Sequence, residues 1–230
     1  MGRSVVLAGA ARCPRCSLPP RWCTCDMLPP VETRLAVHVL LHRHESQKPS
    51  STGKLVARAV SGAASHVYQR ETRFSPAATV TADRLGPEGE VWILHPNGDP
   101  LPLAAGASAD SSHARRHVLL LDGTWRQSGE MLRTVEGMGR CVCLPHASDE
   151  PSRNWLRDQA EPEQLSTAEA LMGVFRAVGD HGAEHGLRLH FELHVYATLL
   201  ARGKREMAER YLGHSPLLAD APEALAHLHR

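Results

Sequence analysis

Short apolar runs alternate with amphipathic segments along most of the chain, and this alternation constrains the fold more than any other feature. Four runs rich in aliphatic and β-branched side chains have the character of strands covered on both faces. They are RLAVHVLLH (34–42), VWILHP (91–96), HVLLLD (117–122) and RCVCLP (140–145). Helical patterns follow most of them, as crossover connections between parallel strands require. The sequence therefore predicts an α/β fold, a parallel sheet with flanking helices.

Residues suited to helix ends mark the expected helices. Ser51 or Thr52 can cap the first helix, and Ser166 with Glu169 has the spacing of a capping box. Gly203 is placed to interrupt the last helix. The predicted segments are 53–61, 124–137, 165–178 and 187–212. These are local signals, so they indicate helix boundaries without specifying how the helices pack.

Two long polar stretches are expected to be loops. Residues 97–116 join the second and third strands, and residues 147–164 follow the fourth. Structureless connections in compact domains are usually much shorter than the second of these. We therefore expect residues 147–164 to form a binding loop.

Four cysteines near the N-terminus follow the pattern C-x2-C-x6-C-x-C and are interleaved with prolines that favour tight turns. They are Cys13, Cys16, Cys23 and Cys25. Two close pairs of thiolates suit the tetrahedral geometry of structural zinc, which would supply the folding energy of so short a segment. Disulfides and a catalytic dithiol are the alternatives; a reducing compartment disfavours the first, and the second normally follows a strand. We expect a zinc-binding module over residues 1–32.

The other candidate metal ligands lack such spacing. Cys141 and Cys143 alternate along the fourth strand, point one way and are expected to be buried as small apolar residues. The 15 histidines are scattered along the chain. His38, His42 and His44, around the first strand, have no zinc-ligand spacing beside a carboxylate, so core or surface roles are expected for them.

Charge is distributed unevenly along the sequence. Residues 1–75 hold 11 Lys and Arg against 4 Asp and Glu, although the net charge of the 230-residue chain is only +1. A basic third suits a phosphate-rich partner, but it is equally typical of a solvated surface.

No run approaches the roughly 20 apolar residues of a membrane span. The N-terminal apolar stretch is too short for a secretory signal, so we expect a cytoplasmic protein without membrane association.

The segment LDGTW, at the end of the third strand, is the strongest candidate for a functional site. Ligands of open α/β sheets bind at the carboxyl ends of the strands, where Asp122 is expected. Thr124 can cap the next helix, and Trp125 offers a flat apolar face. In the alternative, Asp122 is only a cap and Trp125 packs in the core beside Leu132 and Val135.

The sequence contains no phosphate loop, dinucleotide fingerprint, zinc-protease helix or serine-hydrolase elbow. These absences disfavour a kinase, a nucleotide triphosphatase, a Rossmann enzyme, a zinc protease and a serine hydrolase.

Three ordered stretches resemble the DTW-domain family, which is named for the Asp-x-Thr-Trp found here at 122–125. They are RCPRCSLPPRWCTCDMLPP, LLDGTWRQSGEML and SRNWLRDQAEPEQLSTAEAL. LLHRHESQKPSSTGKLVARAV and WILHP are also similar, so the resemblance runs from about residue 12 to 200. One departure is NGDPLPLAAG after WILHP, where the family more often has a compact turn. The resemblance implies that residues 33–230 form a SPOUT-like catalytic domain, related to a class of knotted α/β enzymes.

The activity implied by this resemblance is that of a tRNA-uridine aminocarboxypropyltransferase. Such an enzyme moves the 3-amino-3-carboxypropyl group of S-adenosylmethionine to N3 of a uridine in tRNA and releases 5′-methylthioadenosine. tRNA is the expected partner, and no obligate protein partner is expected. Two alternatives are a zinc-ribbon RNA-binding protein without catalysis and a SPOUT RNA methyltransferase, which would release S-adenosylhomocysteine.

The resemblance also implies roles for individual residues. Asp122 is the expected general base for the N3 proton of uridine. Cofactor contacts are expected from strand ends and from a helix start whose amides suit the methionine carboxylate, at Leu94, His95, Thr124, Trp125, Leu165, Ser166 and Thr167. RNA contacts are expected from Lys48, Lys54, Arg58, Arg153, Trp155 and Arg157, with Arg12, Arg15 and Arg21 of the zinc module.

Overall fold

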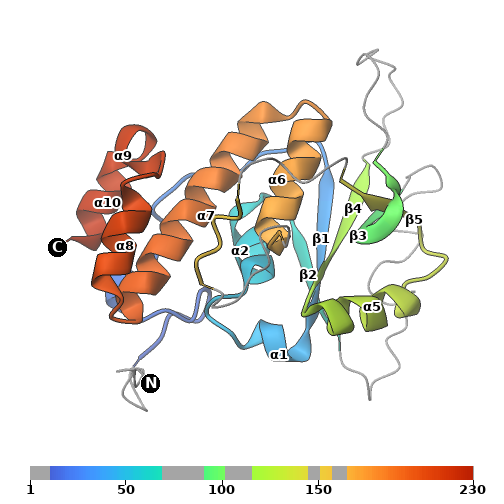
Figure 1. Cartoon of the computed structure of the whole chain (residues 1–230), viewed down its shortest axis with the longest axis horizontal. Coiled ribbons are helices and arrows are strands. Elements are labelled where there is room, and N and C mark those ends of the chain that lie inside the picture. Colours follow the sequence, from blue (N-terminus) through green and yellow to red (C-terminus); the bar gives the residue numbers. More distant parts are fainter. Residues whose placement is uncertain (1–10, 69–90, 102–115, 145–150, 157–164, 230) are drawn as a thin grey trace.

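A five-stranded parallel sheet forms the centre of the molecule, with the strand order β2-β1-β4-β3-β5 (Figure 1). The computed structural model describes residues 11–68, 91–101, 116–144, 151–156 and 165–229. The strands are β1 (Ala36–His42), β2 (Ala64–Tyr68), β3 (Val91–Pro100), β4 (His117–Asp122) and β5 (Arg140–Cys143). The parallel α/β sheet predicted from the sequence is confirmed. The edge strand β2 was missed, because it is short and alternates partly buried with exposed side chains.

The helices begin and end close to their sequence signals. They are η1 (Pro20–Trp22), α1 (Arg43–Ser46), α2 (Thr52–Ala59), α5 (Trp125–Thr134), α6 (Thr167–Ala177), α7 (His181–Ala201), α8 (Arg205–Leu212), α9 (Leu217–Asp220) and α10 (Pro222–Leu228). Ser51 caps α2, and Ser166 forms the expected capping box with Glu169. Gly203, with a φ of 72°, separates α7 from α8. In Figure 1, helices α8 to α10 gather beside one end of α7.

The sheet separates two apolar clusters. Alternate residues of β4 point to opposite sides, so Val118 and Leu120 join one cluster whereas Leu119 and Leu121 join the other. The larger cluster includes buried side chains of α2, α6 and α7, and the smaller one includes Met131 on α5 and Val135 just after it. All six residues of β4 are buried, as expected of a central strand covered on both faces.

The cysteine-bearing segment packs into the larger cluster. Cys16, Leu18 and Val31 are buried together with side chains of the sheet and helices. The backbone of Val31 pairs with α2 through the carbonyl of Ala59, at 2.8 Å. Apolar packing therefore continues across the boundary expected at residue 32.

Two predicted details differ in the structure. Residues 97–100 were expected to begin a loop, but β3 continues to Pro100 beside β5 after a shift in register. Gly98 makes this possible, because a Cβ there would lie 2.5 Å from the backbone nitrogen of Val142. Cys141 and Cys143 are only partly buried, since Val142 between them faces the core.

None of the helices within the described residues combines the length and the apolar character that crossing a bilayer requires.

Candidate functional site

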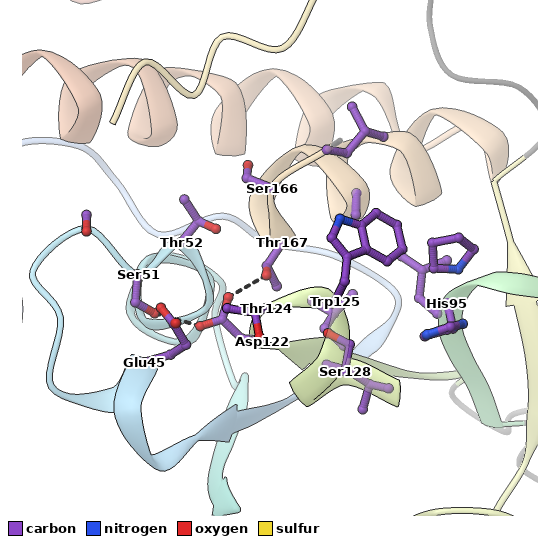
Figure 2. Close-up of a pocket in the computed structure, with 18 of the residues that line it drawn as sticks. Glu45, Ser51, Thr52, His95, Asp122, Thr124, Trp125, Ser128, Ser166 and Thr167 are labelled. Carbon is purple, nitrogen blue, oxygen red and sulfur yellow. Dashed lines mark hydrogen bonds between the residues drawn. The ribbon is translucent and has the colours of Figure 1, made fainter. Parts of the chain in front are cut away.

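A cavity of about 610 Å³ lies at the carboxyl ends of β1, β3 and β4, within the size range of small-molecule sites (Figure 2). Asp122 lines it, together with every residue that the sequence analysis assigned to cofactor contacts. Those residues are Leu94, His95, Thr124, Trp125, Leu165, Ser166 and Thr167. Segments as far apart in the chain as Glu45 and Ala170 thus meet at one site, as expected for an open α/β sheet.

Three helix N-termini converge on the cavity. Ser51, Thr124 and Ser166 are the N-caps of α2, α5 and α6, and all three line the cavity. Each helix has at least eight residues, so each presents the positive end of a helix dipole and free amides of its first turn. The cavity is therefore suited to a negatively charged group of a ligand.

Asp122 connects two of these helix starts. Its Oδ2 accepts a hydrogen bond from Ser51 Oγ at 2.8 Å, and its Oδ1 accepts one from Thr167 Oγ1 at 2.5 Å (Figure 2). The side chain is 2% exposed, so it forms part of the floor of the cavity. Gly53 packs directly against it, because a Cβ there would lie 2.6 Å from Asp122 Cγ. Hydroxyl donors and nearby helix ends favour a negative charge on this carboxylate.

Trp125 and His95 lie across the cavity from Ser51 (Figure 2). Trp125 is 49% exposed and lines the cavity, so the alternative in which it packs in the core beside Leu132 and Val135 is wrong. His95 is buried, and burial lowers its pKa below the usual 6.5. Its Nδ1 accepts a hydrogen bond from the backbone amide of Asn97 at 3.2 Å. The proton of the neutral ring is therefore on Nε2, a buried donor that has no hydrogen-bond partner among the described residues.

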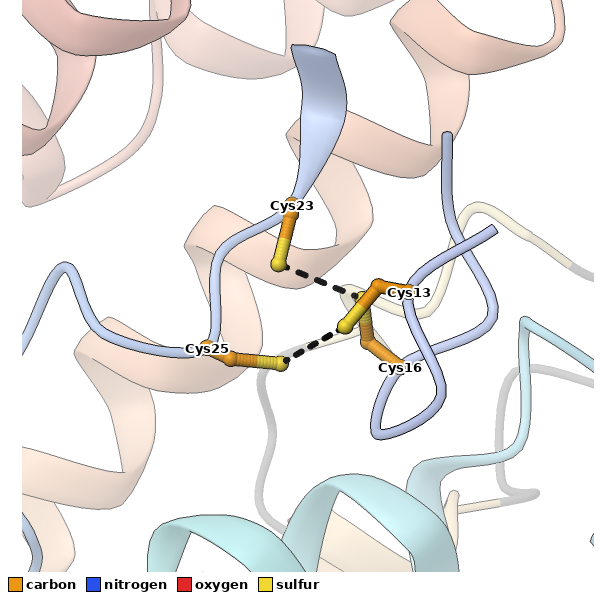
Figure 3. Close-up of side chains that lie close together, drawn as sticks. All are labelled: Cys13, Cys16, Cys23 and Cys25. Atoms are coloured by element: carbon orange, nitrogen blue, oxygen red, sulfur yellow. Dashed lines mark hydrogen bonds between the residues drawn. The ribbon is translucent and has the colours of Figure 1, made fainter. Parts of the chain in front are cut away.

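The four N-terminal cysteines form a second polar site, with their sulfur atoms turned toward one another (Figure 3). Sulfur atoms are 3.8 Å apart in the pairs Cys13–Cys25 and Cys16–Cys23, and all four lie within 4.8 Å of one another. A zinc tetrahedron with bonds of about 2.3 Å has sulfur–sulfur edges of about 3.8 Å. The distances are too long for disulfides, whose sulfur atoms are about 2.05 Å apart. The cluster could therefore hold a metal ion such as zinc.

One thiol of this cluster is already biased toward the thiolate that metals bind. Burial raises the pKa of Cys13, but hydrogen bonds involving the backbone of Cys16 and Arg15 and the thiols of Cys23 and Cys16 lower it to about 6. Burial raises the pKa of Cys23 and Cys25. Since metal binding requires deprotonated thiols, binding of the ion would release protons from the cluster.

A scan against protein-family models matches the DTW domain over residues 10–199. The chain belongs to the DTW-domain family. The matched region contains both the cavity and the cysteine cluster, and the match supports a tRNA-modifying protein in general terms. No solved structure gives a significant match to the chain.

Within the DTW domain, four of the nine residues assigned to RNA make internal contacts. The guanidinium of Arg153 donates to both carboxylate oxygens of Glu192 at 3.0 and 2.7 Å, and Glu192 is 2% exposed. It also donates to the carbonyl oxygen of Tyr211 at 3.1 Å, and Trp155 packs edge-on against the Tyr211 ring. The expected pairing of Arg153 with RNA phosphates is thus replaced by an internal ion pair that anchors the segment before Leu156.

Lys54 and Arg58 also make internal contacts: Lys54 with Ser17 and Arg58 with His194. Lys48 differs, because it lies at the cavity and is half exposed, with Glu45 as its ion-pair partner at 2.6 Å. Of the arginines near the cysteines, Arg15 pairs with Asp26 at 2.6 Å, whereas Arg12 and Arg21 are exposed. Arg157 lies outside the described residues. The exposed positive charge near the cavity is therefore smaller than the sequence suggested.

Several cavity residues of the DTW domain were missed by sequence reasoning. Glu45, Ser51, Thr52 and Leu156 line the cavity, but they belong to segments far from LDGTW. Ser51 was recognised only as a helix cap, and the hydroxyl group that caps α2 also donates to Asp122. The segment ESQKPSSTG, just after the first strand, carried the available signal, because that position places it at the same edge of the sheet.

Proposed function

We propose that the protein transfers the 3-amino-3-carboxypropyl group of S-adenosylmethionine to N3 of a uridine in tRNA, as the resemblance to aminocarboxypropyltransferases implies. The observation that carries the proposal is the cavity at the DTW motif, where three helix N-termini meet beside a carboxylate. A SPOUT-like relationship and a knotted chain are part of the same proposal and rest on the sequence resemblance.

The cavity offers complementary groups for three parts of S-adenosylmethionine. Leu94, Leu144, Leu156 and Leu165 provide apolar surface for the adenine ring. The helix N-termini suit the carboxylate of the methionine moiety. The exposed face of Trp125 can stabilise the positively charged sulfonium by a cation–π interaction.

The reaction needs a proton acceptor beside the nucleophile. Uridine N3 attacks the γ-carbon of the aminocarboxypropyl group, the bond from that carbon to sulfur breaks, and the electron pair remains on the sulfur of 5′-methylthioadenosine. Presenting this carbon, rather than the methyl carbon, in line with N3 selects the transferred group. The N3 proton must leave the nucleobase, and Asp122 is the proposed base.

Thr167 is the proposed link between the nucleobase and Asp122. Asp122 is covered, whereas Thr167 is partly exposed at the cavity and donates to Asp122 Oδ1. In this proposal the Thr167 oxygen receives the N3 proton while its own hydroxyl proton moves to Asp122. Lys48, which also lines the cavity and is half exposed, is the proposed contact with the RNA backbone.

Product analysis tests the proposal directly. The protein is incubated with unmodified tRNA and S-adenosylmethionine, and the modified nucleoside and the small product are identified by mass spectrometry. We expect 3-(3-amino-3-carboxypropyl)uridine and 5′-methylthioadenosine. A methylated nucleoside with S-adenosylhomocysteine would instead identify a methyltransferase. Absence of any product, together with an unchanged melting temperature on adding S-adenosylmethionine, would leave a non-catalytic RNA-binding protein.

A further inference from the structure

Helix α2 (Thr52–Ala59) contacts both polar sites of the molecule. Its N-cap Ser51 donates to Asp122 at the cavity, and Gly53 packs against the same carboxylate. Lys54 and Arg58, four residues apart and so on one face of the helix, are directed to the cysteine segment and to α7. Eight helical residues thus join the cavity to the cysteine cluster.

The contact made by Lys54 fixes the turn that carries two of the cysteines. Lys54 Nζ donates to Ser17 Oγ at 2.9 Å, and Ser17 directly follows Cys16. Ser17 has a φ of 62°, a left-handed conformation that favours glycine. Its amide donates to the carbonyl oxygen of Cys13 at 2.8 Å, which closes the turn. The hydrogen bond from Lys54 therefore explains a serine at a position that favours glycine.

Arg58 is hydrogen-bonded to a buried histidine and is close enough to the cysteines for their charges to act on it. Its Nη2 donates to Nδ1 of His194 at 3.2 Å, and His194 is fully buried. Burial lowers the pKa of His194 well below 6.5, so the ring is neutral and accepts this hydrogen bond. Burial also lowers the pKa of Arg58, and the charges of Cys25, Cys16 and Cys23 oppose this effect. A cation placed here is stabilised by negative charge on the thiols.

The charges match if the cluster holds a divalent ion. Four thiolates around one such ion keep two negative charges, and Lys54 and Arg58 supply two positive charges. Arg15 also lies near the cluster, and the hydrogen bond to Asp26 and the charges of Cys25 and Cys13 raise its pKa; however, it forms an ion pair with Asp26 at 2.6 Å, so the two together add no net charge. Polar groups around a metal site hold its ligands in place and raise its affinity for the ion.

We infer that α2 couples the metal centre to the cavity, with Lys54 and Arg58 as charge partners of the metal–thiolate cluster and Ser51 as the contact with Asp122. Filling the metal site holds α2 in position, and that position places the Ser51 hydroxyl on Asp122 and the α2 N-terminus at the cavity. The inference rests on metal binding by the cysteines and is independent of the transfer reaction.

Metal affinity tests the role of the two cations. Affinity of the full chain is measured by chelator competition for zinc and by the absorption of bound Co²⁺ for Arg58→Gln, Lys54→Gln and the charge-retaining Arg58→Lys. Arg58→Gln and Lys54→Gln should each bind metal about 10- to 100-fold more weakly than the wild type. The metal affinity of Arg58→Lys should fall less, because lysine keeps the positive charge. Arg21→Gln is the matched control, because Arg21 is exposed beside the same cysteines and stacks on Trp22. Equal affinity of Arg58→Gln and Arg21→Gln would overturn the assignment.

Hydrogen exchange of the wild-type protein tests the coupling itself, without tRNA or S-adenosylmethionine. Removing the metal with a chelator should speed exchange of the α2 amides about tenfold or more. Helix α5, on the other side of the sheet, provides the internal control and should change little. Unchanged exchange in α2, or equal acceleration in α2 and α5, would overturn the coupling. Restoring zinc should restore slow exchange in α2.

Discussion

The two faces of the sheet are stabilised in different ways. On one face, α2 and α6 are held by hydrogen bonds from Ser51 and Thr167 to Asp122, and the cysteine segment packs beside them. On the other face, α5 is held mainly by apolar contacts of Met131 and of Val135 just after it. The Asp122 contacts and the cysteine cluster are thus on the first face, whereas the second carries the smaller apolar cluster and, at the start of α5, the cavity residues Thr124 and Trp125. Substitutions at the Asp122 contacts should therefore affect function and stability together, whereas those in the apolar contacts of α5, away from its start at the cavity, should affect stability alone.

The largest effect is expected from Cys16→Ser. Cys16 belongs to the main core, so the substitution removes one ligand of the proposed metal site and leaves a polar hydroxyl in an apolar environment. We expect a loss of about 4 kcal/mol or more in the free energy of unfolding. Zinc content and thermal unfolding provide the measurement. Cys141→Ser, at a partly buried thiol outside the cluster, is the control and should retain its metal. Retention of metal by the Cys16 variant would argue against a four-cysteine site.

The second-largest effect is expected from Asp122→Asn, which removes the negative charge of the side chain but keeps its size. The amide cannot take the place of a base, so turnover should fall by about 10²- to 10⁴-fold. Thr167→Val should also lower turnover if the threonine passes the proton. Rates are measured with saturating S-adenosylmethionine, and cofactor binding is measured separately by calorimetry. Wild-type turnover by the asparagine variant would exclude Asp122 as the base.

Met131→Ala tests the apolar face. Met131 is fully buried in the cluster beneath α5, so truncation should cost about 2–5 kcal/mol of unfolding free energy. Urea unfolding gives this value, and affinity for S-adenosylmethionine should be unchanged under conditions where the variant is folded. A large loss of affinity would show that the two faces are not separable.

Gly53→Ala and Gly129→Ala form a matched pair on α2 and α5. A Cβ at Gly53 would lie 2.6 Å from Asp122 Cγ, whereas one at Gly129 would meet nothing within 4 Å. The first substitution should therefore cost about 1–3 kcal/mol, and the second should stabilise the protein by about 0.5–1 kcal/mol. Both are measured by urea unfolding. Equal effects would contradict the close packing of α2 on Asp122.

The smallest predicted effect is a dependence of stability on pH. Burial lowers the pKa of His190 and His194 below the ordinary 6.5, so the unfolded chain binds protons first as pH falls. Stability should therefore decrease below pH 6.5, by at most about 1.4 kcal/mol per pH unit for each histidine. Urea unfolding at pH 7.5 and 5.5 gives the slope. His190→Gln should reduce it, and His185→Gln, at an exposed position, should not; identical slopes would contradict the prediction.

Much of the fold could be predicted from the sequence, because its signals are local. Apolar runs identified four of the five strands, and the capping residues Ser51, Ser166 and Glu169 marked two helix starts. The edge strand β2 was not predicted, since a short strand that is exposed at alternate residues lacks a strong apolar signal. The candidate cavity was also foreseeable in outline, because parallel strands bring their carboxyl ends to one edge.

The partners of charged side chains could not be predicted. Lys54, Arg58 and Arg153 were assigned to RNA from their charge, yet each makes an internal contact. Arg153 meets Glu192, which lies 39 residues away in the sequence. The sequence shows only that a charged side chain needs either a polar partner or water. The packing of the folded chain decides which of the two surrounds it.

By itself, the sequence determined the strand and helix pattern, the clustered cysteines and the position of Asp122 at the end of a strand. Only the tertiary structure decided that this carboxylate joins the starts of α2 and α6, that Trp125 faces the cavity rather than the core, and that α2 connects the cavity to the cysteines. The physical reason is the separation in sequence of the residues that interact. Periodicity and capping depend on neighbours a few residues apart, whereas these contacts join segments that meet only after the sheet has brought them together.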